Sequence, residues 1–387
     1  MLSEMMPPIS CDVLIVGAGP AGSATALRLV DLLAADDRSA RIVMVETSHF
    51  DSFRIGESLP PDSRALFAQL GVLPAFLDAA HQPCWGSCSS WGDNELGFND
   101  FALNIHGHGW HVERNRFDAM LAEQAAERGV EVYEGWRVRD AVAFVDGGYQ
   151  ISLRDDDQRE QTLSARIVVD ASGQAGVFTH AVGARRIYDD RLVCIAGVFN
   201  LKEDSKVDQR TLLEAAPYGW WYCARINAEQ AIVSVTSDSS TARLHALSSL
   251  GSWFAHLART RHMGERLHGS KLASEGLQPW AAPCFHLDRS VGADWLAVGD
   301  SAISYDPIAA QGIHKALATG IAAAEAIAHR LQDRRADFSD YSAGLEDRHR
   351  DYLRLRQALY ASEQRWHDQP FWQARRKLGA LLVANAA

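Results

Sequence analysis

The chain has 387 residues, of which 47% are hydrophobic and 22% charged, and its formal net charge is −11. This composition is that of an ordinary globular protein, and the length suits a nucleotide-binding domain with an inserted second domain. A negative charge without a long basic run argues against nucleic acid as the main partner. The N-terminus has no signal-like region and no uncharged stretch is long enough to span a membrane, so we expect a cytoplasmic protein without membrane contact.

A glycine-rich turn lies between the first predicted strand and the first predicted helix. An apolar run ends at Val16, and Ala/Leu-rich helical sequence follows the turn. In such a turn the first glycine allows a tight bend, the second lets the backbone approach a diphosphate, and the third lets the helix pack on the strand. The diphosphate then lies at the positive N-terminus of the helix. We assign to the cofactor Gly17, Ala18, Gly19, Pro20, Ala21 and Gly22.

A second apolar run ends in the carboxylate of Glu46. Its distance along the chain from Gly22 is that of the residue that accepts a hydrogen bond from a ribose 2′-hydroxyl. A carboxylate at this position repels a 2′-phosphate, so the sequence predicts FAD or NAD rather than NADP.

A polar loop at residues 54–60 follows the second strand closely and is expected to lie beside the nucleotide; a plain surface turn is the alternative. Arg114 precedes a predicted helix and is well placed to reach a diphosphate or a flavin, although a surface ion pair would also explain it. The cofactor candidates from this part of the chain are Arg54, Gly56, Glu57, Ser58, Arg114 and Val138.

Two later turns resemble the first in combining a strand end, an acidic residue and glycine. One strand ends at Asp170, and another delivers Asp300, whose carboxylate can accept a hydrogen bond from a ribityl hydroxyl. The turn from Pro307 starts a helix whose N-terminal dipole can stabilise the anion of a reduced flavin. These turns add the cofactor candidates Asp170, Gly173, Gly299, Asp300, Gln311, Gly312 and Ile313.

Residues 185–283 have a sheet-like pattern and predict an inserted, mostly β substrate domain. Alternation places Trp220 and Tyr222 on one face of a strand and Trp221 on the other. These aromatic side chains could either pack in the core or line a substrate pocket, and the sequence leaves both roles open. We place the nucleotide-binding domain at residues 1–184, with small excursions into the substrate domain near 80–112, and its continuation at 284–335. Residues 336–387 are predicted to form a helical C-terminal segment.

Six cysteines are scattered through the chain, and only Cys84 and Cys88 lie close together. A zinc site of the common kind needs a second such pair. We therefore interpret the cysteines as reduced thiols that fill core space, and we predict no metal.

Together, the three turns resemble the fingerprints of the FAD-dependent aromatic hydroxylase superfamily. The resemblance implies an α/β fold of the p-hydroxybenzoate hydroxylase type. This fold has a Rossmann-like FAD-binding domain, an inserted antiparallel-sheet substrate domain and, here, a helical C-terminus. The 54–60 loop and residues 110–114 further resemble the flavin-dependent tryptophan halogenases. The family relationship implies that a separate flavin reductase supplies reduced FAD, which then reacts with O2.

Two departures argue against halogenation. The halogenases carry a catalytic lysine soon after the Gly-Glu loop, but this chain has no lysine before Lys202. Arginine cannot substitute, because its guanidinium stays protonated. The Trp-x-Trp-x-Ile-Pro stretch of the halogenases has its counterpart here in residues 219–224, with a different sequence. Residues 56–61, 90–92, 109–111 and 219–222 instead look most like the flavoprotein maturases of the LodB, GoxB and QhpG type, which install quinone cofactors from tryptophan in partner enzymes.

The resemblance predicts an FAD-dependent monooxygenase that hydroxylates an aromatic ring, namely a tryptophan side chain of a partner precursor protein. Glu57, His81 and His111 are the candidates for proton transfer. The substrate-facing candidates are Trp220, Trp221, Tyr222 and Pro307. Three alternatives stay open: oxygenation of a free or carrier-bound aromatic metabolite, a non-catalytic flavin-binding chaperone, and reduction of a double bond as in geranylgeranyl reductases.

Overall fold

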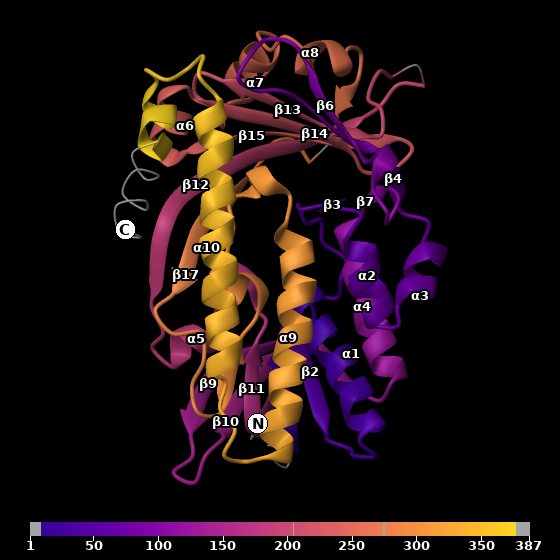
Figure 1. Ribbon diagram of the computed structural model, residues 1–387, viewed down its shortest axis with the longest axis vertical. Coiled ribbons are helices and arrows are strands. Elements are labelled where there is room, and N and C mark those ends of the chain that lie inside the picture. Colours follow the sequence, from indigo (N-terminus) through magenta and orange to yellow (C-terminus); the bar gives the residue numbers. More distant parts are fainter. Residues whose placement is uncertain (1–8, 204, 274, 377–387) are drawn as a thin grey trace.

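Two large β-sheets, one below the other in Figure 1, organise the chain. The computed structural model describes residues 9–203, 205–273 and 275–376. Within these ranges seven strands form the lower sheet, nine form the upper sheet, and three form a small sheet beside them. The predicted α/β class, with a largely antiparallel second sheet and a helical C-terminus, is confirmed.

The lower sheet is a parallel nucleotide-binding sheet extended by an antiparallel ribbon. Its strands are β1 (Ile9–Val16), β2 (Ile42–Glu46), β8 (Glu131–Glu134), β9 (Trp136–Ala143), β10 (Tyr149–Asp155), β11 (Glu160–Asp170) and β18 (Trp295–Ala297). The order is β8-β2-β1-β11-β10-β9, and β18 pairs with the end of β11. All pairs are parallel except those of the β9–β10–β11 ribbon. β1 is buried from Val13 to Val16, as a strand covered on both faces requires.

Two helices bring their N-termini to the same edge of this sheet. α1 (Pro20–Ala35) follows β1, and α9 (Gly312–Gln332) packs along it (Figure 1). α1 opens with a proline, whose fixed φ and missing N–H suit the first helical position. The carboxyl ends of parallel strands point to this edge, which is where ligands bind in sheets of this type.

The upper sheet is mostly antiparallel and has the order β19-β17-β12-β15-β14-β13-β5-β6, with β16 paired to β12. Its strands are β5 (Gly86–Ser90), β6 (Gly97–Asp100), β12 (Arg186–Asn200), β13 (Arg210–Ala216), β14 (Gly219–Arg225), β15 (Gln230–Asp238), β16 (Lys271–Leu272), β17 (Gln278–Leu287) and β19 (Ile303–Ser304). β5 and β6 come from the 80–112 segment, and β17 crosses the boundary predicted at 283. The domain boundaries stay a prediction.

The small sheet and the remaining helices surround this framework. The small sheet consists of β3 (Ser58–Leu59), β7 (Gly109–His111) and β4 (Gln82–Cys84). The α-helices are α2 (Ser63–Gln69), α3 (Leu73–Asp78), α4 (Arg114–Glu127), α5 (Val177–Ala181), α6 (Ser239–Leu244), α7 (Leu250–Leu257), α8 (Met263–Arg266) and α10 (Ser339–Ser362). The 3₁₀ turns are η1 (Phe101–Leu103), η2 (Gly173–Ala175), η3 (Gly299–Ser301) and η4 (Pro307–Ala309). α10 runs along the molecule past both large sheets (Figure 1).

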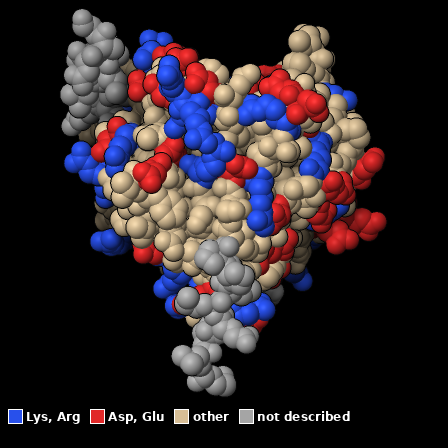
Figure 2. Space-filling model, turned by 90° about the horizontal axis from the view of Figure 1, so that it is seen from below, with Lys and Arg blue, Asp and Glu red and all other residues tan. Residues whose placement is uncertain are grey.

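Residues 377–387, at the end of the predicted helical segment, lie outside the described part of the chain. In the part that is described, no helix combines the length and the apolar character needed to cross a lipid bilayer. Figure 2 shows basic and acidic side chains interspersed over the lower face, in keeping with a chain that has no long basic run.

Candidate active site

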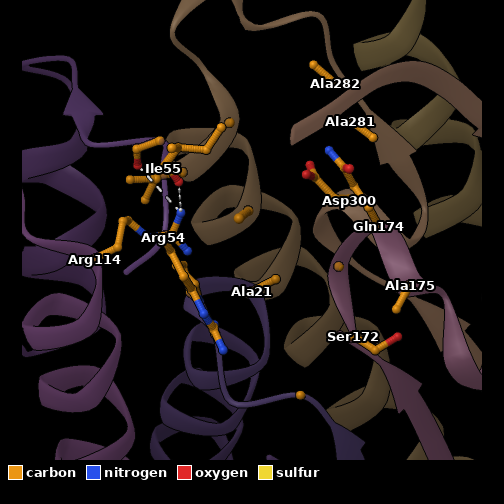
Figure 3. Close-up of a pocket in the computed structure, with 18 of the residues that line it drawn as sticks. Ala21, Arg54, Ile55, Arg114, Ser172, Gln174, Ala175, Ala281, Ala282 and Asp300 are labelled. Carbon is orange, nitrogen blue, oxygen red and sulfur yellow. Dashed lines mark hydrogen bonds between the residues drawn. The ribbon is translucent and has the colours of Figure 1, made fainter. Parts of the chain in front are cut away.

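A cavity of about 600 Å³ is lined by residues of both large sheets and by all three glycine-containing turns. The turn after β1, the turn after β11 and the turn after β18 converge on it, although they lie far apart in the sequence. Figure 3 shows Arg54, Ile55 and Arg114 on one side of this space, and Ser172, Gln174 and Asp300 on the other.

The first turn has the geometry of a dinucleotide cradle. Gly17 has a φ of +108°, and a Cβ added to it would lie 2.4 Å from the carbonyl oxygen of Ala171. A Cβ on Gly22 would lie 1.9 Å from the carbonyl oxygen of Gly17, so only glycine lets α1 approach β1 this closely. A Cβ on Gly19, by contrast, would meet no atom within 4 Å. Gly19 borders the cavity, and this open space fits a diphosphate drawn close to the backbone at the start of α1.

Glu46 lines the cavity and also holds the glycine turn in place. Its carboxylate accepts hydrogen bonds from the backbone N–H of Ala18 at 2.9 Å and from the Ser48 hydroxyl at 2.7 Å. Burial alone would raise the pKa of Glu46, but the hydrogen bonds from Ser48 and Ala18 lower it below the ordinary value. Glu46 is therefore an ionised acceptor at the position predicted for the ribose contact.

Asp170 shapes the second turn but does not line the cavity. Its buried carboxylate accepts hydrogen bonds from the hydroxyl of Ser172 at 2.6 Å and from the backbone N–H of Thr179 at 2.7 Å. Residues 171–175, which follow it, reach the cavity instead. The structure thus places Asp170 behind the turn rather than against a cofactor.

Two arginines line the cavity and are held by one buried carboxylate. Arg114 donates to Asp118 at 2.9 and 3.1 Å and to the carbonyl oxygen of Ile55 at 3.1 Å. Arg54 lies 3.2 Å from Glu46 and 3.4 Å from Asp118. Fixed guanidinium groups suit a diphosphate or an anionic flavin edge. Sequence reasoning missed Asp118, although its i,i+4 spacing from Arg114 on a helix was a visible signal.

A buried lysine stands directly behind the third turn, a feature that sequence reasoning also missed. The Lys315 ammonium donates to the Asp300 carboxylate and to the carbonyl oxygen of Ile303. It also lies 4.5 Å from the ring centroid of Tyr305, a cavity residue. Because sequence reasoning considered only the segment before Lys202, this lysine was not anticipated. Lys315 is 4% exposed, is bound to these two acceptors and does not itself line the cavity.

Glu57 and Tyr222 meet at the cavity wall, one from the 54–60 loop and one from the upper sheet. The Tyr222 hydroxyl donates to one carboxylate oxygen of Glu57, and the backbone N–H of Gly56 donates to the other at 2.9 Å. The Ser58 hydroxyl lies 2.8 Å from that of Tyr222. Burial raises the pKa of Glu57, so this carboxyl group holds a proton more readily than an exposed one.

The structure does not bring the two predicted histidines to the cavity. His111 is buried and hydrogen-bonds the Thr211 hydroxyl at 3.0 Å, and His81 packs against Phe76 and Phe117. Burial lowers the pKa of each histidine to about 4. Among the candidates for proton transfer, only Glu57 faces the cavity.

The aromatic strand β14 alternates as predicted. Trp220 and Tyr222 face the cavity, whereas Trp221 packs against Trp253 at 4.8 Å on the other side and donates to the Tyr218 hydroxyl. The other predicted residues that line the cavity are Gly17, Gly19, Pro20, Ala21, Glu46, Arg54, Gly56, Ser58, Arg114, Val138, Gly173, Asp300, Pro307, Gly312 and Ile313. Those outside its lining are Ala18, Gly22, Asp170, Gly299, Gln311, Trp221, His81 and His111.

Two curated relatives of this chain are named as FAD-dependent or flavin-dependent enzymes. LodB of Marinomonas mediterranea, described as an FAD-dependent oxidoreductase, is 28% identical over 380 residues, which cover 97% of this chain and all of LodB. The flavin-dependent halogenase armH3 of Armillaria mellea is 27% identical over 85% of this chain and 69% of its own length.

Solved structures share the fold. The myxobacterial chondrochloren halogenase CndH superposes with a TM-score of 0.86 at 23% identity, covering 98% of this chain and 89% of its own. The peptidyl tryptophan dihydroxylase QhpG superposes with a TM-score of 0.73 at 24% identity, covering 95% of this chain and 79% of its own.

The family model described as Tryptophan halogenase matches residues 12–98 and 93–381, which is most of the chain. The relatives are named as FAD-dependent or flavin-dependent enzymes, and the cradle at Gly19, the two arginines and the third turn fit FAD as the cofactor. The protein is an FAD-dependent enzyme, and it belongs to the tryptophan halogenase family.

Proposed function

We propose that this protein is an FAD-dependent monooxygenase that hydroxylates an aromatic ring. We further propose that the ring is a tryptophan side chain of a precursor protein, modified during tryptophylquinone cofactor biogenesis. Reduced FAD from a separate flavin reductase would supply the activated oxygen from O2. The observation that carries the proposal is the cavity wall itself, where Glu57 and Tyr222 are joined and, among the described residues, no lysine is present.

The lysine content of the site favours hydroxylation over halogenation. A halogenating enzyme of this family needs a free amine that captures hypohalous acid and carries it to the substrate. In the described part of the chain the buried lysine is Lys315, which does not line the cavity. Its ammonium is bound to the Asp300 carboxylate and to the carbonyl oxygen of Ile303. An oxygen atom can therefore pass to the ring without an intervening amine.

The chain's own residues would orient the ring, exclude water and move a proton. An electron-rich indole attacks an activated oxygen without prior deprotonation, so no strong base is needed. Trp220 and an apolar cluster that includes Cys194 and Ile232 line the cavity and keep water from the reacting atoms. Glu57, whose pKa is raised, would accept the proton that the ring carbon loses, with Tyr222 holding its carboxylate in place.

An aromatic pair next in sequence to two cavity residues supports a protein substrate. Phe53 and Trp280 contact each other edge to face at 6.2 Å, and 48% of the Phe53 surface is exposed. Each directly precedes a cavity residue, Arg54 in one case and Ala281 in the other, and Ala281 is itself exposed. The pair therefore joins the segment before Arg54 to strand β17 beside the cavity lining, and its exposed part offers a polypeptide an apolar contact surface.

The relatives are compatible with this substrate class. QhpG is titled a peptidyl tryptophan dihydroxylase essential for tryptophylquinone cofactor biogenesis, so the same fold accommodates a tryptophan within a polypeptide in that protein. The match to LodB covers 97% of this chain and all of LodB, which represents the maturase type that the sequence motifs resemble.

The test combines the protein with reduced FAD, O2 and the precursor protein, followed by mass spectrometry of the precursor. The expected result is a gain of one or two oxygen atoms on a tryptophan. An unmodified precursor together with oxygenation of a free or carrier-bound aromatic compound would favour a metabolite monooxygenase. Tight precursor binding without any mass change would favour a flavin-binding chaperone, and turnover without O2 would favour a reductase.

Replacing Phe53 by alanine is expected to raise KM for the precursor on the order of tenfold, because an exposed aromatic anchor beside the cavity residue Arg54 is lost. The FAD affinity and kcat should change little. Trp85→Ala is the matched control, since Trp85 is equally exposed but contacts His108 rather than a neighbour of the cavity. Initial rates at varied precursor concentration measure both variants. Equal effects of the two substitutions would remove the support that the aromatic pair gives to a protein substrate.

A further inference from the structure

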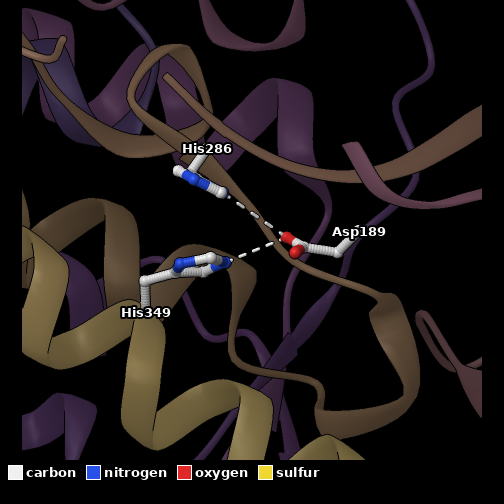
Figure 4. A group of neighbouring side chains, drawn as sticks. All are labelled: Asp189, His286 and His349. Atoms are coloured by element: carbon white, nitrogen blue, oxygen red, sulfur yellow. Dashed lines mark hydrogen bonds and ion pairs between the residues drawn. The ribbon is translucent and has the colours of Figure 1, made fainter. Parts of the chain in front are cut away.

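Three potential metal ligands cluster outside the flavin cavity, where two strands of the upper sheet meet the C-terminal helix. Asp189 lies on β12, His286 on β17 and His349 on α10 (Figure 4). One ligand atom from each lies within 4.8 Å of the others. None of the three lines the cavity, so the cluster is separate from the proposed oxygenation site.

A β-bulge turns Asp189 toward the two histidines. The pairing of β12 with β17 shifts register between Tyr188 and Asp190, so Asp189 has no partner residue opposite it. Bulges re-aim a side chain and often mark functional positions. The next residue, Asp190, instead joins Arg356 and Arg375, so adjacent carboxylates serve two different clusters.

The distances within the cluster suit a bound cation. Asp189 Oδ2 is 3.0 Å from His349 Nε2 and 3.7 Å from His286 Nδ1. Two ligand atoms on a tetrahedral zinc ion lie roughly 3.4 Å apart, given Zn–N and Zn–O bonds of about 2.1 Å. These two separations lie on either side of this value, and the third, between the two histidines, is within 4.8 Å.

His286 Nδ1 is the second observation that points to a ligand. This atom is buried and makes no hydrogen bond among the described residues, and its ion-pair contact with Asp189 Oδ2 is long, at 3.7 Å. About 31% of the His286 side chain is exposed, which leaves a path from solvent.

We propose that Asp189, His286 and His349 bind one Zn²⁺ ion and thereby fasten α10 to the upper sheet. Two imidazoles and a carboxylate are ligands that zinc prefers, whereas magnesium prefers oxygen ligands alone. A water molecule completes the tetrahedron. Cys284 is not counted as a ligand, because its Sγ lies 3.8 Å from Asp189 Oδ2 and also contacts the Tyr352 hydroxyl at 3.6 Å.

The same helix contacts the flavin side of the molecule. From α10, Tyr352 accepts a hydrogen bond from the Asp306 N–H at 2.6 Å, and Arg356 and Tyr360 donate to the Asp306 carboxylate at 3.1 and 2.7 Å. Asp306 lines the cavity next to Pro307. Zinc would therefore stabilise the helix that holds this turn, without touching the reacting groups.

The test uses the full chain, stripped with a chelator and then titrated with ZnCl₂ in the absence of flavin. We expect one zinc per chain by elemental analysis and a rise in Tm of about 3 °C when zinc is in hundredfold excess over its Kd. MgCl₂ should produce neither effect. Because loss of an outer-shell partner already weakens a metal site 10–100-fold, Asp189→Asn and His349→Gln should each weaken zinc binding by about 100-fold or more.

His256→Gln is the matched control. The ring of His256 also lies beside a second histidine, with its centroid 5.4 Å from that of His245, but this pair is not part of the Asp189 cluster. It should bind zinc as the unchanged protein does. If His349→Gln does not fold, zinc binding is measured in His286→Gln instead, because the His286 side chain is the most exposed of the three ligands. The proposal is overturned if the unchanged chain takes up no stoichiometric zinc, or if the folded ligand variants bind zinc as tightly as His256→Gln.

Discussion

Gly22→Ala is expected to destabilise the fold, whereas Gly19→Ala is expected to weaken FAD binding without destabilising it. The added Cβ at position 22 would lie 1.9 Å from the Gly17 carbonyl oxygen, so α1 must move away from β1. Overpacking of this severity costs about 3 kcal/mol in the free energy of unfolding. A Cβ at position 19 meets no protein atom within 4 Å, and its φ of −72° is ordinary for alanine.

Gly19→Ala should therefore keep the Tm of the flavin-free protein, while its Cβ occupies space needed by the diphosphate. We expect the Kd for FAD to rise on the order of tenfold or more, equivalent to about 1.4 kcal/mol. Thermal unfolding of the flavin-free variants and fluorescence titration with FAD measure the two effects separately. A normal FAD affinity for Gly19→Ala would show that the cofactor does not lie against this turn.

Glu57→Gln is expected to lower kcat for hydroxylation by about 10²-fold or more, because the carboxylate that accepts the ring proton is removed. The volume of the side chain and its place beside Tyr222 are kept. Glu113→Gln is the matched control, since Glu113 bonds Asn227 and does not line the cavity. Single-turnover rates with limiting reduced FAD check this, and unchanged rates in Glu57→Gln would exclude Glu57 from the reaction.

The same variant has a pH signature in stability. Burial raises the pKa of Glu57 above the ordinary 4.5, so the folded state binds this proton more tightly than the unfolded chain. The native protein therefore loses stability as the pH rises from about 4.5 through the raised pKa. Glu57→Gln lacks this loss, so it should gain stability relative to the native protein across that window. Denaturant unfolding at several pH values measures the difference, and a difference that does not depend on pH would contradict the raised pKa.

The fold was predictable because its signals are local. The strand, glycine turn and helix around Gly17–Gly22 lie within one continuous segment, and each glycine has a steric reason that sequence alone suggests. The alternation of Trp220, Trp221 and Tyr222 likewise follows from strand geometry. Such patterns identify an element and the face it presents, and the structure places these residues accordingly.

The contacts between segments were not predictable in the same way. Asp170 stands in a fingerprint turn, yet its oxygens are taken by Ser172 and Thr179, which only the three-dimensional turn reveals. Lys315 reaches Asp300 because α9 folds back over the third turn.

The proposed zinc ligands show the limit most clearly. Asp189, His286 and His349 come from three elements that are far apart in the sequence, and none lies in a recognisable ligand spacing. The sequence therefore predicted no metal, and only the packing of α10 against β12 and β17 brings the three residues together.

The most direct test of the central proposal follows the transferred atom in the presence of a competing halide. The precursor is incubated with the protein, reduced FAD and ¹⁸O₂ in excess bromide, and its tryptophan-containing peptides are analysed by mass spectrometry. The cavity wall contains Glu57 and Tyr222 and no lysine of the described residues, which predicts one or two ¹⁸O atoms on the tryptophan and no bromine. Bromine on the ring would contradict direct oxygen transfer.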